Sequence, residues 1–312
     1  MIDVSHKFNT LRYAKAEGVY KSTPDIIEKI KNKRVPKGDV LEIARGAGIS
    51  AAKRTSDWIV FCHPIPMDYI NLSYEIGETE IVVSAEAKTV WKTGVEMEAM
   101  TAVSAALLNM YDMTKPLTDD ITIGEIKLVK KKGGKSDFKD KFEKNITAAV
   151  LVISDSTFEG KREDKSGKVI KEFLDKQLVD VKVYDILPDS KEKITSRIKA
   201  LVDDENIQLV ITTGGTGLGP KDITPDVTAE LIDKRIPGIE EAIRKHGKDR
   251  TPFAMLSREL AGLRGKSIII NLPGSSRGVK ESMDALFPGL LHGFPMIWGG
   301  GHEHGNKKTK EQ

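Results

Sequence analysis

The spacing of apolar residues predicts the elements of the first half of the chain. From Tyr69 to Val90 apolar and polar residues alternate, which predicts two half-exposed strands joined near Gly77. From Gly94 to Tyr111 apolar residues recur at helical spacing, and a last strand is expected from Ile121 to Val129. Pro24, preceded by a threonine that suits an N-cap, marks the start of another helix. Strands in sequence with long helices predict an α+β domain with an antiparallel sheet.

After residue 145 the pattern changes to strands that alternate with helices. Three near-continuous apolar runs, AAVLVIS, QLVITT and SIIINL, are typical of strands buried on both faces. A further strand is expected near Val181–Leu187, with helices that begin at about Ser166 and at Ser190. This alternation predicts a three-layer, doubly wound α/β domain with a mostly parallel sheet.

A hydrophilic stretch from Lys130 to Asn145 separates the two patterns. It combines two adjacent glycines with dense charge, so we interpret it as the end of the first domain and a linker. The expected divisions are a first domain over residues 1–138, a second over residues 146–298 and a disordered, glycine-rich tail over residues 299–312. His302 and His304 could bind a metal, but two ligands on a flexible segment form a weak site. A tail without a metal is therefore favoured.

Composition narrows the classes of function. The chain has 312 residues, of which 30% are charged and 39% hydrophobic, and its formal net charge is +3. These values are ordinary for two globular domains, and so small a charge argues against broad nucleic-acid binding. Cys62 is the only cysteine, and no run of about 18 apolar residues predicts a membrane span. We expect a cytoplasmic protein with small anionic ligands.

Three segments carry the polar residues of the first domain: KGDVLEIARGAGISAAKRT, FCHPIP and KTGVEMEAM, the last of which opens a helix that ends in YDMTK. Lysine and arginine side chains, Arg45 and Lys53 among them, suit the phosphates of a substrate. A carboxylate beside a lysine can exchange a proton near neutral pH, which suits a ring that must be protonated and opened. Metal catalysis is not expected, because His6 and His63 are the only histidines in this half.

Each of these groups also has a purely structural interpretation. Glu96 and Glu98 lie in the first turn of the helix, where acidic residues favour the macrodipole. Two residues apart, they project about 200° from each other, so they share a pocket only if the helix begins at a pocket or subunit boundary. Asp112 and Lys115 could form a solvated helix end, and His63 could be a packed loop histidine.

Residues from about Val4 to Asp137 resemble the MoaC family of cyclic pyranopterin monophosphate synthases. The similar stretches are KGDVLEIARGAGISAAKRT, CHP, KTGVEMEAMTA, YDM and KKGGKSDF. The resemblance implies conversion of a cyclised dihydro-GTP into cyclic pyranopterin monophosphate, with loss of pyrophosphate. It also implies a ferredoxin-like fold and hexamers whose active sites lie at subunit boundaries. We expect no tightly bound cofactor in this domain.

The same resemblance assigns site residues. Asp112 would be the catalytic acid/base, and Lys37 and Lys115 match functional lysines of the family. The candidates for the substrate pocket, besides the two phosphate ligands named above, are Phe61, Cys62, His63, Glu96, Met97 and Glu98. Phe61 stands where leucine is usual in the family, a mild change that leaves the chemistry intact.

Polar or glycine-rich segments follow all four predicted strands of the second domain. They contain Ser154 and Asp155, then Asp189, then the loop with Gly214, Gly215, Thr216, Gly217 and Asp222, and finally the turn with Pro273, Gly274 and Ser275. Because ligands bind at the carboxyl ends of parallel strands, these segments are expected to meet at one edge of the sheet. Glycines and free helix N–H groups suit phosphates, and paired carboxylates suit Mg²⁺. The pattern therefore predicts a Mg²⁺–nucleotide site.

The two aspartates also have structural interpretations. Asp189 fits a capping box with Glu192, and Asp222, which precedes Thr224–Pro225, fits a turn. The glycine loop by itself is a weak signal, because no Gly-Lys-Ser/Thr follows it as in a Walker motif.

Residues from about Ile146 to Ile297 resemble the MoaB/MogA family, which includes the molybdopterin adenylyltransferases. The similar stretches include EDKSG, LPD, TTGGTGLGPKDITPD, MLSRELAGLRG and INLPGS. The resemblance implies attack of the molybdopterin phosphate on ATP, with Asp189 and Asp222 as catalytic aspartates. The same two residues are the Mg²⁺ ligands expected from the pattern of carboxylates beside the glycine loop. Ser257 and Ser275 would contact the pterin. A homo-oligomer, trimeric or hexameric, is expected.

Three functions remain open at this point. The leading hypothesis is a bifunctional enzyme that acts twice on pterin phosphates. In the second, only the first half is catalytic and the other half binds pterin or serves oligomerisation. Ser156 stands where many relatives carry arginine, which leaves the role of its loop open. A scaffold without catalysis is disfavoured, because so many polar positions are intact.

Overall fold

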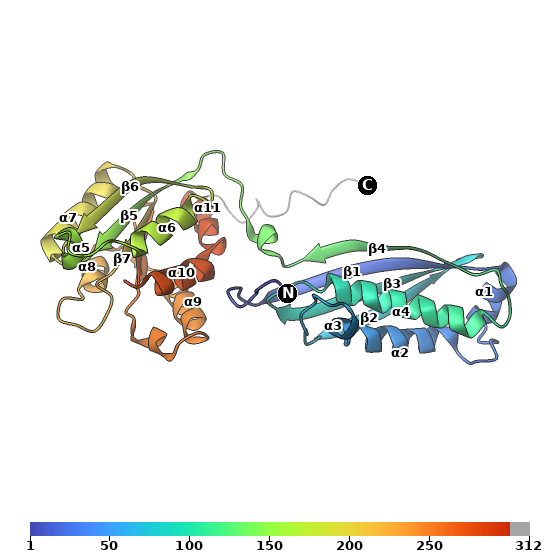
Figure 1. The fold of residues 1–312 in the computed structure, drawn as a ribbon. Coiled ribbons are helices and arrows are strands. Elements are labelled where there is room, and N and C mark those ends of the chain that lie inside the picture. Colours follow the sequence, from blue (N-terminus) through green and yellow to red (C-terminus); the bar gives the residue numbers. More distant parts are fainter. Residues whose placement is uncertain (300–312) are drawn as a thin grey trace. The chain divides into compact units, whose positions relative to one another are not determined.

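The chain divides into two compact units. The computed structural model describes residues 1–299, and the units cover Met1–Asp137 and Phe138–Gln312 (Figure 1). Nearly all of the predicted tail, with His302 and His304, lies outside the described residues. Among residues 1–299, no helix is both long and apolar enough to cross a lipid bilayer. Each unit has an apolar core of its own.

The first unit is built on a four-stranded sheet. Its elements are β1 (Thr10–Lys21), α1 (Pro24–Lys31), α2 (Val40–Ala52), α3 (Thr55–Trp58), β2 (Tyr69–Ile76), β3 (Glu80–Trp91), α4 (Glu96–Thr114), β4 (Thr122–Lys132) and a 3₁₀ turn (Lys135–Phe138). The strand order is β2-β3-β1-β4, and every neighbouring pair is antiparallel. Helices α2 and α4 pack together below the sheet (Figure 1). The predicted antiparallel sheet is confirmed.

Several local predictions hold in this unit. Helix α1 begins at Pro24 with Thr23 as its N-cap, although the threonine hydroxyl makes no capping hydrogen bond. The β2–β3 turn is closed by the Gly77 amide, which donates to the Glu80 carbonyl at 2.8 Å. Strand β4 runs three residues beyond its predicted end, to Lys132, because Lys130–Lys132 pair with β1 in spite of their polarity.

Two elements of the first unit carry no clear apolar pattern. The buried face of β1 consists of Arg12, Ala14, Ala16, Gly18 and Tyr20, most of them small or polar. The buried face of α2 is likewise small. Gly48 is needed on that face, because a Cβ would come within 2.6 Å of a Leu72 methyl carbon and 2.8 Å of the Ala102 carbonyl. Close helix packing, rather than apolar volume, therefore defines these two elements.

The second unit is a three-layer domain around a six-stranded sheet. Its strands are β5 (Ile146–Ile153), β6 (Val179–Leu187), β7 (Leu209–Thr213), β8 (Lys234–Arg235), β9 (Ala261–Arg264) and β10 (Ser267–Leu272). Its helices are α5 (Asp155–Phe158), α6 (Ser166–Leu174), α7 (Lys191–Lys199, continued by a π turn at Ala200–Asp204), α8 (Thr224–Leu231), α9 (Pro237–Lys248), α10 (Ser276–Leu286) and α11 (Gly293–Ile297), with 3₁₀ turns at Pro252–Leu256 and Gly289–His292. The strand order is β6-β5-β7-β10-β9-β8. Strands β6, β5, β7 and β10 pair in parallel, and β9 pairs antiparallel with both β10 and β8, which confirms the mostly parallel sheet.

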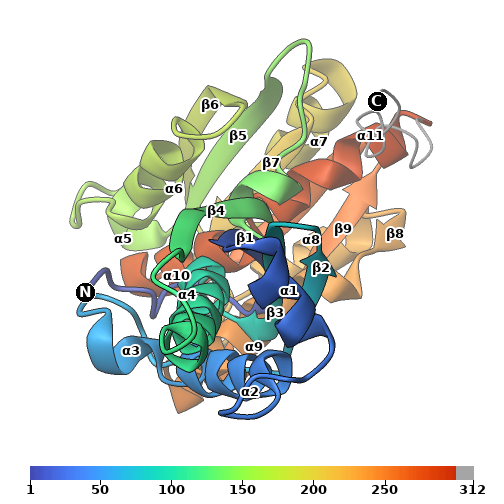
Figure 2. The same cartoon turned by 90° about the vertical axis from the view of Figure 1, so that its right-hand side faces the viewer.

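Successive residues of β5 point into two separate apolar layers. Ala148 and Val150 join a core with side chains of α6, α9 and α10, whereas Ala149 and Leu151 join one with α7 and α8. Figure 2 shows α6 and α7 on opposite sides of β5. Because strand side chains alternate between faces, a strand that is apolar throughout must be covered on both. This burial anchors the strand ends, where the polar loops begin.

Candidate functional site

The polar segments of the second domain meet at the carboxyl edge of its parallel strands. They border a cavity of about 400 Å³. Of the predicted residues, Asp189, Gly214, Gly215, Asp222, Gly274 and Ser275 line it. Ser154 and Lys221 line it as well. The four polar segments therefore meet at one edge of the sheet, as the sequence predicts.

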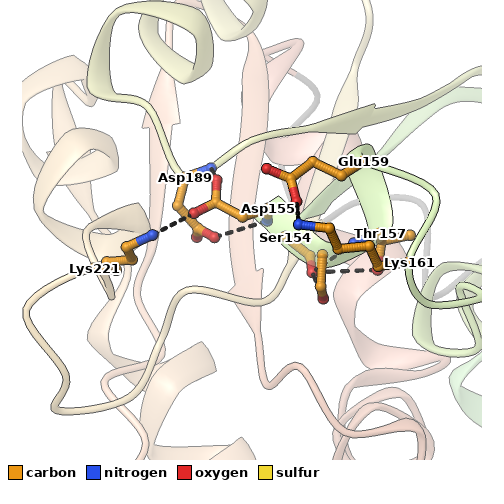
Figure 3. A network of polar contacts seen from close by, with 8 residues as sticks. Ser154, Asp155, Thr157, Glu159, Lys161, Asp189 and Lys221 are labelled. Carbon is orange, nitrogen blue, oxygen red and sulfur yellow. Dashed lines mark hydrogen bonds and ion pairs between the residues drawn. The ribbon is translucent and has the colours of Figure 1, made fainter.

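Two aspartates lock the ends of β5 and β6 together. The Asp155 amide donates to the Asp189 carboxylate, and the Asp189 amide donates to the Asp155 carboxylate, both at 3.0 Å (Figure 3). Lys221 reaches across from the glycine loop and donates to Asp155 at 2.7 Å (Figure 3). This ion pair holds the pKa of Asp155 below its usual value. Burial, together with the charges of Asp155 and Asp222, raises the pKa of Asp189.

This arrangement decides between the interpretations of Asp189. The capping-box interpretation is wrong, because Ser190 is the N-cap of α7 and its hydroxyl accepts from the Lys193 amide at 3.4 Å. Glu192 instead accepts a hydrogen bond from the Ser190 hydroxyl. Asp189, one residue earlier, is left to face the cavity. A cap one position further along the chain thus frees the aspartate for another role.

The glycine loop approaches its neighbours too closely for any side chain. Gly214 and Gly215 have φ values of +100° and +63°. A Cβ on Gly214 would lie 2.2 Å from the Ile153 carbonyl oxygen, and one on Gly215 would lie 2.3 Å from the Thr224 hydroxyl oxygen. Asp222 closes the far end of the loop, where its carboxylate accepts from the Gly219 amide at 2.8 Å. Asp222 therefore has the predicted turn role and also lines the cavity.

Arg258, which the sequence did not single out, holds this loop from outside. Its guanidinium donates to the Gly217 carbonyl at 2.9 Å, to the Asp222 carbonyl and, at 3.0 Å, to both oxygens of Asp226. Its own amide donates to the Thr216 carbonyl at 2.9 Å. A planar fork with five donors suits so many acceptors better than a lysine would. Arg258 is therefore a positioning residue for the loop.

Four of the predicted residues lie beside the cavity rather than in its wall. Thr216 is buried and its hydroxyl lies 3.3 Å from that of Ser257. The Gly217 carbonyl is taken by the arginine described above. Ser257 and Pro273 line a neighbouring cavity of about 170 Å³, which Ser275 also lines.

One wall of the larger cavity, the segment between α5 and α6, contains no residue that was predicted for the site. Arg162, Asp164 and Lys165 line the larger cavity. Asp164 is buried, accepts from the Gly167 amide at 3.0 Å and bonds the Tyr184 hydroxyl. The signal for this wall was the EDKSG stretch, in which an acidic residue precedes a helix start and basic residues flank it.

The residues at the strand ends suit a divalent cation that arrives with phosphates. No group of three or more potential side-chain ligands stands ready within residues 1–299. Asp155 and Asp222 are nonetheless close enough to Asp189 for their charges to raise its pKa, and the Lys221 ammonium group pairs with Asp155. Such crowding of like charges is relieved by a cation, and Mg²⁺ commonly takes one or two carboxylates plus phosphate oxygens.

In the first domain, the predicted pocket residues surround a cavity of about 570 Å³. All six candidates line it, namely Phe61, Cys62, His63, Glu96, Met97 and Glu98. Both glutamates line the same cavity because α4 begins at it. Two residues that project about 200° apart on a helix can share a pocket only where the helix begins at that pocket. Lys7, near the N-terminus, also lines the cavity. Phe61 is 75% exposed, so the cavity is open on that side.

Glu98 is the buried acid of this cavity. It is 3% exposed, and burial raises its pKa to about 7. Burial raises the pKa of the Cys62 thiol, and the charge of the nearby Glu98 carboxylate raises it further. A carboxyl that titrates near neutral pH can give or take a proton under physiological conditions.

The raised pKa of Glu98 implies that the stability of the protein depends on pH. The Glu98 carboxyl titrates near 4.5 when exposed and at about 7 when folded, so the folded state favours its protonated form. The free energy of unfolding should therefore fall as the pH rises from 4.5 to 7, by about 3 kcal/mol at most, and stay low above that. Glu98→Gln should remove the Glu98 share of this fall, so the difference between thermal melts at pH 5 and pH 8 should shrink. The exposed Glu78→Gln is the control, and an unchanged pH dependence in Glu98→Gln would contradict the prediction.

The acid–lysine cluster lies at the other end of α4. Asp112 accepts from Lys37 at 2.9 Å and pairs with Lys115 at 2.8 Å. Lys37 also donates to the Asp112 carbonyl at 2.7 Å, one of the helix-end carbonyls that lack an internal partner. Lys115 and then Lys37 lower the pKa of the Asp112 carboxyl to about 2. At neutral pH the cluster is thus a carboxylate between two ammonium groups.

The two polar groups of the first domain are separated within one chain. Glu98 and Asp112 are fourteen positions apart on α4, which is about 21 Å along a helix axis. Of the basic candidates, Arg45 lies within α2 and Lys53 is the C-cap of that helix. Neither lines the cavity at the start of α4. Arg45 pairs with Glu42 at 3.4 Å, and its buried Nε has no hydrogen-bond partner among residues 1–299.

Known proteins resemble both halves. Residues 1–134 match the MoaC family, and residues 149–292 match a probable molybdopterin binding domain. The molybdenum cofactor biosynthesis bifunctional protein of Chlorobaculum tepidum is 40% identical over 302 residues, which cover 97% of this chain and 96% of that protein. The cyclic pyranopterin monophosphate synthase of Clostridium perfringens is 49% identical over 138 residues, 44% of this chain and 87% of that enzyme. The crystal structure of MoaB from Thermus thermophilus covers 49% of this chain and 97% of its own, with 40% identity and a TM-score of 0.48.

Proposed function

Since this chain belongs to the family of molybdenum cofactor biosynthesis bifunctional proteins, we propose that it performs two reactions on pterin phosphates. The first domain forms cyclic pyranopterin monophosphate from a cyclised dihydro-GTP and releases pyrophosphate. The second domain binds molybdopterin and adenylylates it with ATP. The observation that carries the second reaction is the meeting of the glycine loop, Asp189 and Asp222 around one cavity at the sheet edge.

In the first domain, the substrate binds in the cavity at the start of α4. Glu98, with a pKa near 7, exchanges protons with the ring, and Lys7 offers a cation for phosphate. The cluster of Asp112, Lys37 and Lys115 supplies the remaining acid–base groups. Because Asp112 is ionised and its carboxylate raises the pKa of Lys115, the proton donor of this cluster is an ammonium group that the carboxylate orients.

A second copy of the chain completes this site. The substrate cannot touch both ends of α4, so the lysine cluster that acts on it comes from another subunit. Phe61, which lines the cavity and is 75% exposed, is close in sequence to two further exposed apolar side chains, Trp58 (52%) and Val60 (80%), and exposed apolar residues suit such a contact. The strand order 4-1-3-2 of the antiparallel sheet supports a ferredoxin-like assignment for this domain. A shared site requires at least two copies of the chain, and we propose that they assemble as a hexamer or trimer.

In the second domain, an oxygen of the molybdopterin phosphate attacks the α-phosphorus of ATP. A new P–O–P bond forms, the bond between the α-phosphorus and its bridging oxygen to the β-phosphate breaks, and pyrophosphate leaves. Amides of the glycine loop, where Gly214 and Gly215 leave the backbone open, face the phosphates together with the N-terminus of α10. Asp189 and Asp222 would hold Mg²⁺, which neutralises charge on the transferring phosphate when bound.

One turnover assay tests the second reaction. The full chain is incubated with ATP, Mg²⁺ and molybdopterin, and adenylylated product and pyrophosphate are quantified. We expect both to appear together and to require all three additions. Retained molybdopterin binding without any pyrophosphate would mean that the second domain is a binding module. Formation of cyclic pyranopterin monophosphate by the same preparation is the measure of the first reaction.

Arg258→Lys is expected to weaken ATP binding about ten- to hundredfold without unfolding the domain. Lysine cannot replace the bonds to Gly217, Asp222 and Asp226 at once, and charged hydrogen bonds contribute about 1.5–3 kcal/mol each. ATP affinity is measured by calorimetry. Arg197→Lys, which alters an arginine paired with two acids far along α7, is the matched control. Equal ATP affinity in both variants would show that the loop does not depend on Arg258.

A further inference from the structure

A small cavity adjoins the phosphate-binding edge of the second domain. Its volume is about 170 Å³, and Ser275 lines both it and the larger cavity. Pro273 lines the small cavity and the next residue, Gly274, lines the large one. Phe253 and Ile243 provide apolar walls. A flat ring in the small cavity would therefore leave its substituent pointing at the glycine loop.

Glu259 offers this cavity a carboxylate without a complete set of partners. The residue is 3% exposed and lines the cavity, and its Oε2 is buried without a hydrogen-bond donor among residues 1–299. Ser257 bonds the carboxylate through its hydroxyl. The nearest cation, Arg244, is already engaged, since it donates to the Glu240 carboxylate and to the backbone carbonyl of Glu259. A buried acceptor of this kind is costly to leave unpaired, so its donor is expected from a ligand.

The missing donors have a defined chemistry. A carboxylate is best satisfied by two parallel N–H groups, as in its pairing with a guanidinium fork. The 2-amino-4-oxopyrimidine ring of a pterin or a guanine presents such a pair, its ring N3–H and its 2-amino group. Adenine presents one donor beside one acceptor, so it does not match. Phe253 can cover the face of a ring held in this way.

We propose that Glu259 binds the 2-amino-4-oxopyrimidine edge of the pterin and so selects the ring that the second domain accepts. With the ring in the small cavity, the phosphate of the same molecule passes Ser275 and enters the larger cavity. The identity of the ligand as a pterin rests on the proposed function, whereas recognition of the ring edge requires binding alone.

The charge of Glu259 adds a pH dependence. Burial raises its pKa to about 7, and the charged groups that face it are Arg244 and Glu240 from α9 and Glu281 from α10. Two ring donors favour the ionised carboxylate, so the ring must displace a proton when the pH is below 7. Affinity for the ring should therefore fall up to tenfold per pH unit below about 7 and level off above it for as long as the ring N3–H keeps its own proton.

The test uses the full chain and 6-hydroxymethylpterin, whose fluorescence reports binding. Glu259→Gln is expected to weaken pterin binding at least tenfold at pH 8 and to remove the pH dependence, while ATP affinity stays within twofold. Glu241→Gln, on the exposed side of α9, is the matched control. The unaltered chain should bind lumazine, which has a carbonyl in place of the 2-amino group, at least tenfold more weakly than the pterin, and this comparison needs no variant.

Several results would overturn the assignment. Equal pterin affinity in the unaltered chain and Glu259→Gln, or equal affinity for pterin and lumazine, would remove Glu259 from ring recognition. Binding of GMP but not of the pterin would identify a guanine site. Failure of adenylylation in the unaltered chain, with Glu259-dependent pterin binding intact, would refute the proposed reaction and leave the recognition standing.

Discussion

Asp112→Asn is expected to lower formation of cyclic pyranopterin monophosphate by about 10²–10⁴-fold, the usual loss for an acid–base group. The Asp112 carboxylate holds Lys37 and Lys115 within 3 Å, with distances of 2.9 and 2.8 Å, and its pKa of about 2 keeps it charged. Asparagine has the same shape but no charge, so the two ammonium groups lose the partner that orients them. Product and pyrophosphate are measured with the cyclised dihydro-GTP as substrate.

The control for this variant is Asp119→Asn, an exposed aspartate just after the same helix. Circular dichroism should show that both variants keep the fold, because the lysine cluster is exposed and lies outside the core. Near-normal product formation by Asp112→Asn would show that the cluster is only a solvated helix end.

Mixing Asp112→Asn with a Glu98→Gln variant adds a test of the shared site. If the groups come from different subunits, mixed oligomers recover part of the activity that neither variant has alone.

Asp222→Asn is expected to lower Mg²⁺-dependent adenylylation of molybdopterin by about 10²–10³-fold, with little change in thermal stability. Asparagine can still accept the hydrogen bond from the Gly219 amide, which is 2.8 Å from the aspartate in the structure. The loop should therefore keep its shape. What is lost is a negative charge beside the cation and the phosphates, and a neutral amide oxygen replaces it poorly.

Molybdopterin binding and ATP turnover separate the two roles of Asp222. Binding should be retained in Asp222→Asn, and a higher Mg²⁺ concentration should be needed for half-maximal turnover. Asp204→Asn, at the exposed end of the helix that follows β6, serves as the control. Intact adenylylation in Asp222→Asn would reduce this residue to its turn role. Asp189→Asn should lose a similar amount of activity, since it faces the same cavity and is also held by the Asp155 amide.

Glu98 and Glu259 share one physical feature in the two domains. Each is a buried glutamate that lines a cavity, and burial raises the pKa of each carboxyl to about 7. Neither position is optimal for stability, because a buried carboxylate loses the hydration that favours its charge. In both domains, the group that is costly for folding lies where a ligand would contact it. Function is the simplest reason for a chain to keep such groups.

Local sequence determined the elements whose apolar period was strong. The buried strands β5, β7 and β10 are nearly all apolar, so their type and the order of strand and helix followed from the chain itself. The glycine loop after β7 is equally visible in the sequence, and the rule that ligands bind at the carboxyl ends of parallel strands predicts that it lies beside Asp189 and Asp222. Elements with small buried residues, β1 and α2, could not be predicted in this way. Gly48 shows why, since its absent side chain matters only against Leu72 and Ala102.

Only the tertiary structure decided which polar groups share a site. Burial of Glu98 and Glu259, and with it their pKa values, comes from residues distant in the chain that remove water from around them. The grip of Arg258 on the glycine loop joins positions up to 42 apart in sequence, and no local pattern marks it. Periodicity records the contacts that repeat along one element, whereas a site is made of single contacts between elements, and these exist only once the chain has folded.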